Sequence, residues 1–208
     1  MEKGQEVVEC SRVIAIICLM PPTPAEFSKT VFLHGREFVL RLPQPLDALQ
    51  VVGYSNEFNA ESEFTLFPEE RITLTDAQGY INRVLAKIQR GEAVYLFAFC
   101  QEQLVGRVSL NLDSGVQRHQ GELGISVRQG FRNLGLGRVM IEEVLELASQ
   151  NLPGLEQAWL TTFANNDRAL HLYQKLGFRE FGRLPRGIKR GEEYCDFVYM
   201  WKRVGEGD

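Results

Sequence analysis

Two short blocks of the sequence carry residues whose types and spacing could do chemistry. The first is the run Arg132-Asn133-Leu134-Gly135-Leu136-Gly137, with Arg138 directly after it. Glycines lack a Cβ atom, so a phosphate can approach the backbone of such a run closely. The second block pairs Asn166 with Tyr173, an amide and a phenol that are seven residues apart. Together the blocks suggest an enzyme that holds a pyrophosphate cofactor and protonates a leaving group.

The flanking hydrophobic patterns place the first block at a turn between a strand and a helix. Residues 121–127 alternate apolar side chains, which is typical of a strand with one buried face. Apolar residues then recur at helical spacing from Val139 to about Asn151. The first amide N–H groups of a helix have no internal partner, and the helix dipole adds partial positive charge there. The turn is therefore predicted to bind an anion, with Arg132 and Arg138 adding charge.

Three known sequence patterns of phosphate-binding loops are candidates for this turn. The dinucleotide fingerprint needs Gly or Ala three residues after Gly137, where the sequence has Met140. The nucleotide P-loop needs Lys where Leu136 stands. The third pattern, Arg/Gln-x-x-Gly-x-Gly/Ala, is matched fully by Arg132, Gly135 and Gly137. A glycine-rich turn without a ligand is the remaining alternative.

The second block has the pattern of a short amphipathic helix. Asn165-Asn166-Asp167 is a predicted helix start, because short polar side chains accept hydrogen bonds from free amides there. Gly177 is a natural stop. Asn166 and Tyr173 then share a helix face. Taken alone, Tyr173 is more often a core aromatic residue whose hydroxyl is satisfied.

In this order, the two blocks resemble the GNAT superfamily of N-acetyltransferases, and the resemblance covers residues 36 to 202 approximately. Its specific part runs from Glu122 to Met200. The family uses the Arg/Gln-x-x-Gly-x-Gly/Ala loop for coenzyme A. The resemblance implies acetyl-CoA as co-substrate, no metal, and acetyl transfer to a primary amine of a small molecule or peptide. The acceptor site is the family's most variable part, so the resemblance leaves the acceptor open.

The resemblance also assigns roles to single residues. The strand that ends at Val127 would pair its backbone with the pantetheine arm, and Asn166 would touch the cofactor. Tyr173 would protonate the departing thiolate. The pyrophosphate would be bound by the loop residues Arg132, Asn133, Leu134, Gly135, Leu136, Gly137 and Arg138.

The mechanism expected from these residues is direct attack in a ternary complex, because no activated nucleophile is evident. Glu122, at the start of the splayed strand, is the candidate general base, with a surface carboxylate as the alternative. One rival function is a non-catalytic acyl-CoA-binding or sensing module on the same fold. Another is transfer of a longer acyl chain.

One acidic segment of the sequence bears on the charge of the acceptor. Residues 56–70 contain five glutamates, no basic residue and three phenylalanines, and they join two predicted helices. We predict a lid with a negative rim that favours basic acceptors, with Glu61 and Glu63 as substrate contacts. The alternative is a solvated acidic loop. Asp196, on a late strand, is the third predicted substrate contact.

The predicted elements alternate strands and helices around one sheet. Their order indicates an α+β fold with a central, mostly antiparallel mixed sheet and helices on both faces. Residues 30–204 are predicted to form one domain, after a lead-in over 1–29 and before a tail over 205–208. Besides the elements above, we predict a hairpin over 30–42, helices over 46–55 and 75–91, and strands over 93–100, 103–112, 158–163, 178–188 and 193–202.

Composition excludes several other classes. The net charge of −4 argues against a general nucleic-acid binder, which would normally be basic. The apolar run Val13–Met20 is far shorter than the about 20 residues of a membrane span. The four cysteines show no paired spacing, so we expect reduced thiols in a cytoplasmic protein. A monomer and a homodimer both remain open.

Overall fold

The computed structural model of the chain describes residues 27–61, 63–67 and 70–205, with the backbone alone at Glu61. The predicted lead-in therefore lies outside the described residues except for residues 27–29, and Ser28 already begins the first strand. Most of the tail over 205–208 also lies outside them. No helix within these ranges is long and apolar enough to cross a membrane.

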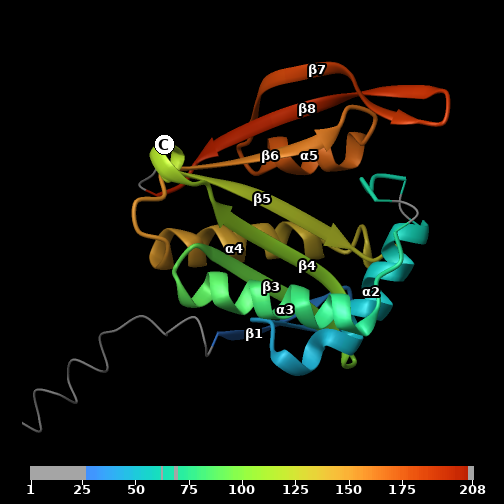
Figure 1. Cartoon of the computed structure of the whole chain (residues 1–208), viewed down its shortest axis with the longest axis vertical. Helices are drawn as coiled ribbons and strands as arrows, with labels where there is room; N and C mark the ends of the chain where they lie inside the picture. The colour runs from blue at the N-terminus through green and yellow to red at the C-terminus, as the bar shows by residue number, and fades with distance from the viewer. Residues whose placement is uncertain (1–26, 62, 68–69, 206–208) are drawn as a thin grey trace, which may run out of the picture.

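Eight strands form one sheet in the order β1-β2-β3-β4-β5-β6-β8-β7 (Figure 1). Neighbouring strands are antiparallel, except that β5 and β6 are parallel. This confirms the predicted mixed, mostly antiparallel sheet. The strands are β1 (Ser28–Leu33), β2 (Arg36–Arg41), β3 (Ala93–Cys100), β4 (Gln103–Leu112), β5 (Gln120–Val127), β6 (Gln157–Phe163), β7 (Arg179–Arg190) and β8 (Glu193–Arg203).

Helices cover both faces of this sheet, as predicted (Figure 1). One face packs against α4 (Leu136–Asn151) and α5 (Asp167–Lys175), whose apolar residues share one core cluster with Leu123 and Val108. The other face packs against α2 (Ala48–Glu61) and α3 (Leu74–Gln89). Short 3₁₀ turns lie at η2 (Pro45–Asp47), η3 (Gly115–Gln117) and η4 (Gln129–Phe131).

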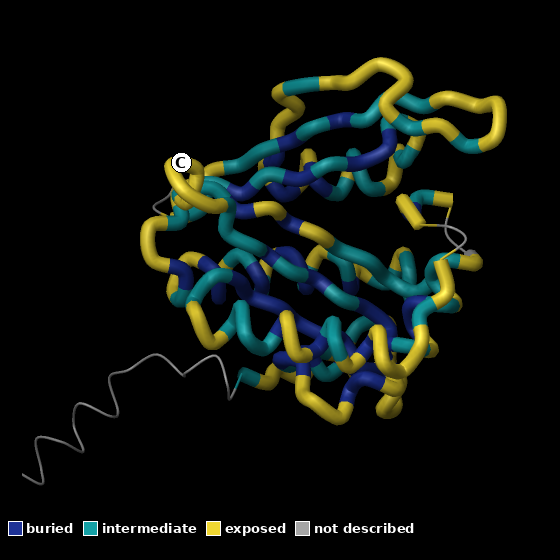
Figure 2. The backbone as a smooth tube through the Cα atoms, viewed as in Figure 1, coloured by how far each residue is buried: buried dark blue, intermediate teal, exposed yellow. Residues whose placement is uncertain are grey.

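The core lies in the middle of the sheet, where β3 is buried along its whole length (Figure 2). At one end of the sheet, most residues of β7 are exposed, because β7 is an edge strand with a neighbour on one side only. Its neighbour β8 contributes Val198 and Met200 to the core. The predicted strands over 178–188 and 193–202 are thus confirmed as the β7–β8 hairpin.

The predicted short helix over 46–55 is longer than expected. The helix α2 continues to Glu61 and takes up the first six residues of the acidic segment 56–70. The ring of Phe58 stacks on that of Tyr54, with 6.0 Å between the centroids and 8° between the planes. This contact between residues four apart stabilises the extra helical turns. The glutamates around Phe58 made the segment resemble an acidic connection instead of a helix.

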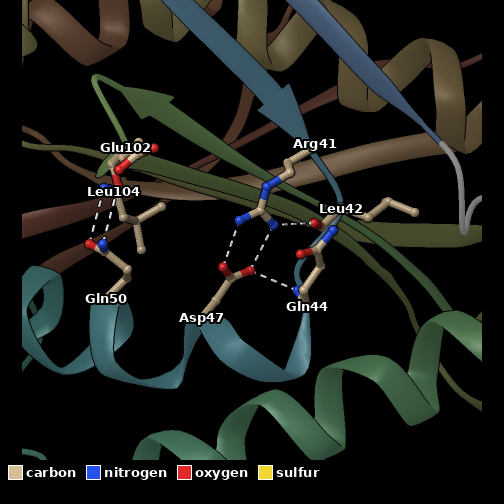
Figure 3. A network of polar contacts seen from close by, with 7 residues as sticks. All are labelled: Arg41, Leu42, Gln44, Asp47, Gln50, Glu102 and Leu104. Atoms are coloured by element: carbon tan, nitrogen blue, oxygen red, sulfur yellow. Dashed lines mark hydrogen bonds and ion pairs between the residues drawn. The ribbon is translucent and has the colours of Figure 1, made fainter.

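A partly buried ion pair fixes the start of α2 to the sheet (Figure 3). The Asp47 carboxylate accepts hydrogen bonds from both terminal nitrogens of Arg41, at 2.8 and 2.6 Å, and from the Gln44 amide at 2.7 Å. The Gln50 side chain then donates to the Glu102 carbonyl at 3.1 Å. Fork-shaped pairing of this kind sets orientation as well as distance. It aims the following turns of α2, with Tyr54 and Phe58, over β4 and β5.

Candidate active site

The strands β5 and β6 pair at one end and separate at the other (Figure 1). Their parallel ladder joins residues 120–122 to residues 157–159. Beyond Glu122, β5 keeps its pairing with β4 as far as Val127, while β6 pairs with β8. One edge of β5 is therefore left open beside a gap in the sheet.

The hydrogen bonds to β4 show which residues of β5 face that gap. The Asp113 amide donates to the Gln120 carbonyl, and the Arg128 amide donates to the Val105 carbonyl, both at 2.9 Å. The backbone groups of alternate residues in an antiparallel strand point to opposite neighbours. The N–H and C=O groups of the even-numbered residues of β5 therefore point toward β4. The backbone groups of Val127, the predicted partner of the pantetheine arm, therefore point into the gap. Those of Leu123 and Ile125 do so too. Neither residue was predicted from the sequence as a site residue, although both alternate along the strand with the same period as Val127.

The predicted phosphate loop forms an uncapped helix start. Gly135 is the N-cap residue of α4, with a left-handed φ of 79°, and no side chain caps the helix there. The amides of Leu136, Gly137 and Arg138 therefore have no carbonyl partner within the helix. A Cβ atom at Gly135 would meet no other described residue within 4 Å. The turn is thus an open cradle of N–H groups that fits a phosphate.

The arginines of the loop have partners within the protein. The Arg132 Nε atom donates to the Val127 carbonyl at 2.7 Å, and the guanidinium lies 5.8 Å from the Phe58 ring centroid. This ties the loop to the end of β5. Arg138 pairs with Glu142 at 2.8 Å on the exposed surface of α4. The anion cradle therefore depends on backbone amides more than on these two side chains.

A cleft of about 400 Å³ brings three predicted site residues together, namely Glu63, Arg132 and Asn166. Asn166 caps α5, and its side chain accepts a hydrogen bond from the Ala169 amide at 3.3 Å. The predicted helix start is thus confirmed. The cleft lies between the α2–α3 connection, the phosphate loop and the start of α5. Its other lining residues are Phe64, Gln129, Asn165, Asp167 and Arg168.

Tyr173 lies in the core cluster between α4, α5 and the sheet, and 7% of its surface is exposed. Its ring packs edge-on against Phe178, with 6.1 Å between the centroids. Burial raises the pKa of the Tyr173 hydroxyl to about 12. The phenol is therefore protonated at neutral pH, as a proton or hydrogen-bond donor must be.

Glu122 lies on the opposite face of the sheet from Tyr173. Its neighbour Leu123 packs on the α4 side, so the Glu122 side chain points toward α3. It pairs across the ladder with Asn111, whose side-chain oxygen accepts from Lys87 at 3.0 Å. Desolvation is the main cause that raises the pKa of the Glu122 carboxyl, and repulsion by Asp113 adds to it, while Lys87 acts in the other direction.

The other predicted substrate contacts differ in their surroundings. Asp196 accepts a hydrogen bond from the Arg186 amide at 2.9 Å and lies 3.6 Å from an Arg183 nitrogen. These bonds span the bulge of β7, where its pairing with β8 shifts register and Arg186 has a φ of 55°. The Asp196 carboxylate is thus engaged in the hairpin. Glu61 is the last residue of α2.

Distant arginines contact the acidic segment, which has no basic residue of its own. Arg128 pairs with Glu57 at 3.0 Å, and Arg190 donates to the Thr65 carbonyl. The negative rim predicted for residues 56–70 is therefore partly neutralised. Composition within the segment carries no signal for these contacts, because they are made by residues far along the chain.

Cysteines and metal-ligand residues form no cluster in the part of the chain that the structure describes. Cys100 and Cys195 are free, and Cys10 and Cys18 lie outside the described residues. Within the same part of the chain, no three His, Cys, Asp or Glu side chains gather as a metal site would require.

Comparison with known proteins identifies the family behind this geometry. The model of the acetyltransferase (GNAT) family matches residues 56–178. The L-amino acid N-acetyltransferase AaaT of Escherichia coli is 28% identical over 106 residues, which are 50% of this chain and 65% of that protein. The matched region thus spans slightly less than two thirds of this relative.

Solved structures share the fold. An acetyltransferase of the GNAT family from Streptococcus pneumoniae has a TM-score of 0.73 and 29% sequence identity, over 81% of this chain and 99% of that one. RimL, a ribosomal alpha-N-protein acetyltransferase in complex with coenzyme A, has a TM-score of 0.71. Its identity is 12%, over 85% of this chain and 98% of that one, so this likeness concerns the fold alone.

Proposed function

Because this chain belongs to the GNAT family of acetyltransferases, we propose that it transfers acetyl from acetyl-CoA to a primary amine of a small molecule or peptide. The observation that carries the proposal is the uncapped start of α4 at the end of an open strand edge. A ligand with a phosphate at one end and an amide-containing arm fits both features. The named activity of the relative AaaT, on L-amino acids, supports an amine acceptor.

The chain's own residues would hold the two ends of the cofactor separately. The amides of Leu136, Gly137 and Arg138 bind the pyrophosphate, and Asn166 contacts the arm from the cleft. Leu123 and Ile125 offer N–H and C=O groups to the arm along the gap. Val127 offers its N–H group, because its carbonyl already accepts a hydrogen bond from Arg132. An N–H group of this edge also polarises the thioester carbonyl and stabilises the negative charge that develops on its oxygen.

Acetyl-CoA supplies the activated acyl group, and the protein handles the protons. The attacking amine must be neutral, yet amines of this kind have a pKa of about 8 to 10. Glu122 removes a proton from the amine, directly or through a water, on the α3 face of the sheet. The new C–N bond forms as the C–S bond breaks, and a proton returns to the sulfur.

Tyr173 acts on the departing sulfur from the other face of the sheet. Its pKa of about 12 lies above the about 8.5 of an ordinary thiol, so complete proton transfer from the phenol is uphill. A hydrogen bond to a thiolate carries no such cost. We therefore assign to Tyr173 the donation of a strong hydrogen bond to the sulfur while the C–S bond breaks. The proton that completes the thiol is taken up from solvent, so the phenol keeps its own proton.

The proposal is tested by incubating the protein with acetyl-CoA and a panel of amines while release of free coenzyme A thiol is followed. The panel contains polyamines, amino acids, aminoglycosides and peptides with free N-termini. Acceptor-dependent thiol release, with acetylated amine found by mass spectrometry, supports the proposal. Tight binding of coenzyme A with no thiol release for any acceptor would favour a non-catalytic binding module instead.

The pH profile tests Glu122 as general base. The base must be ionised, so kcat/KM rises as pH passes through the pKa of Glu122, which lies above its ordinary value. We expect Glu122→Gln to remove this acid limb and to lower the plateau about 10²-fold. Asp113→Asn should shift the limb to lower pH, because it removes a repulsive charge and can still accept from Trp159. Repeating the profile with an amine of different pKa separates the acceptor's own ionisation.

A matched carboxylate provides the control for that profile. Glu142, paired with Arg138 on the exposed face of α4, is changed to Gln in parallel and should leave the acid limb in place. An unchanged limb in Glu122→Gln would make Glu122 a surface carboxylate and move the base elsewhere.

The remaining assignments are part of the same proposal. Glu61, Glu63 and Asp196 stay predicted acceptor contacts. Glu63 lines the cleft beside Arg132, whereas the Asp196 carboxylate is engaged in the β7–β8 hairpin. A cytoplasmic setting is proposed from the absence of paired cysteine spacing in the sequence.

A further inference from the structure

A half-buried arginine lies on the α2–α3 face of the sheet. Arg107 of β4 stands opposite Ser126 of β5, and its guanidinium carbon lies 4.8 Å from the Tyr54 ring centroid and 5.6 Å from that of Tyr80. Among the described residues, no hydrogen bond or ion pair reaches this guanidinium. Aromatic rings contact the flat face of a guanidinium, whereas its N–H donors lie at its edge. The edge of Arg107 is therefore available to an anion.

A second arginine beside it has a donor without an acceptor. Arg128 follows Ser126 by two residues, so it points to the same face, and its guanidinium carbon lies 5.9 Å from the same Tyr54 ring. Its side chain is 12% exposed, and one terminal nitrogen pairs with Glu57. The Nε atom is buried and has no hydrogen-bond partner among the described residues. Buried donors without acceptors are rare and costly, so this atom indicates an acceptor supplied by a ligand.

The surroundings of Tyr54 show that the electrostatic potential here is positive. The Tyr54 hydroxyl donates to the Ser126 hydroxyl at 2.8 Å. Burial raises the pKa of Tyr54, and the charges of Arg107, Arg132 and Arg128 act in the opposite direction. Three guanidinium groups therefore lie near this hydroxyl, with Glu57 as the carboxylate paired to one of them.

This positive site lies next to the gap in the sheet. Along the β4–β5 ladder, the pairs that share its face are Arg107 with Ser126, Ser109 with Gly124, and Asn111 with Glu122. Successive pairs on one face are about 7 Å apart. Gly124, which has no side chain, thus lies between the arginines and the candidate base. An amine above Gly124 would have Glu122 on one side and the reach of the Arg107 side chain on the other.

We propose that the acceptor is an α-amino acid whose carboxylate binds to Arg107 and the Nε atom of Arg128, an assignment that rests on the proposed acetyl transfer. An α-amino acid carries its carboxylate one carbon from its amine, which suits the short step from Gly124 to Arg107. Arginine binds carboxylates through paired N–H groups, so the site orients the amine as well as holding the ligand. Acceptors without a carboxylate, polyamines included, leave the Arg107 guanidinium and the Nε atom of Arg128 without an acceptor.

The experiment compares each free amino acid of a panel with its amide and its decarboxylated amine. We expect kcat/KM to be about 10²-fold higher for the free acid. The amine of an amino acid amide is less basic than that of the free acid, so a larger fraction of it is neutral and able to attack. The measured preference for the free acid is therefore a lower bound on the contribution of the carboxylate. In Arg107→Met, which keeps the packing between the tyrosine rings, this preference should vanish through a higher acceptor KM. The KM for acetyl-CoA should not change, and Arg107→Lys should restore part of the preference.

The control is Arg90→Met, which removes an exposed arginine that pairs with Glu92 at the end of α3. It should preserve the preference for the free acid. Equal or better use of amides and decarboxylated amines would overturn the carboxylate assignment while leaving acetyl transfer established. A rise in the acetyl-CoA KM in Arg107→Met would overturn it as well, because it would assign Arg107 to the cofactor.

A binding measurement separates this inference from the proposed function. Amino acids and their amides are titrated calorimetrically into the protein with coenzyme A present. Selective binding of the free acids that Arg107→Met abolishes supports the carboxylate site, even if no acetyl transfer is found. Equal binding of acid and amide, or no binding of either, overturns it.

Discussion

Replacing Tyr173 by phenylalanine should lower turnover roughly 10²–10⁴-fold and leave the affinity for acetyl-CoA almost unchanged. The change removes the hydroxyl alone, so the edge-on packing of the ring against Phe178 persists. The hydroxyl acts when the C–S bond breaks, and its loss therefore affects kcat rather than cofactor binding. The measurements are steady-state kcat from thiol release and the acetyl-CoA dissociation constant from calorimetry.

The pKa of Tyr173 adds a second expected result. The donor must keep its proton, so activity that depends on it is lost as pH rises through about 12. Ionisation of Tyr173 should therefore cause no loss of activity below about pH 10. Any loss seen there should occur in Tyr173→Phe as well. Tyr199→Phe, in the packed rings of the β7–β8 hairpin, is the matched control and should retain normal turnover. If Tyr173→Phe unfolds more easily but turns over normally per folded molecule, Tyr173 is a core residue and the donor lies elsewhere.

The parts of the site that depend on local sequence could be predicted. The glycines of the loop and the capping Asn166 act within one turn of the helices that they begin, and both helix starts lie where the sequence places them. Helical periodicity places Tyr173 on the same helix face as Asn166, whereas its predicted role comes from the family resemblance. The sheet order could be predicted only as a class, because pairing between distant strands leaves no mark within either strand.

The acceptor face could not be predicted, because it is assembled by pairing across the sheet. Arg107 alternates with apolar residues and reads as an ordinary outward side chain of β4. Only the register that sets it opposite Ser126, and the ion pair that holds α2 above it, reveal the arginine cluster. The glutamates of residues 56–70 predicted a negative rim, and the fold brings Arg128 and Arg190 against it.

The phosphate cradle leads to the other large effect. Changing Gly135 to valine should raise the coenzyme A dissociation constant roughly 10²-fold or more, and no metal should be needed for binding by the wild type. The new side chain would project into the open space before the α4 amides, where the pyrophosphate is expected to bind. Calorimetry of coenzyme A binding gives the constant for each variant.

The control separates blocked approach from backbone strain, because Gly135 has a φ of +79° and any side chain strains that turn. Gly154, in the connection from α4 to β6, has a φ of +81° and equally open surroundings among the described residues. Gly154→Val should therefore lose similar stability and keep its affinity for coenzyme A. Gly137→Ala should keep both its stability and its affinity for coenzyme A, because its Cβ would make ordinary contacts of 3.5 and 3.8 Å with Leu172 and Ile125. Equal affinity of wild type and Gly135→Val would remove the pyrophosphate from this loop.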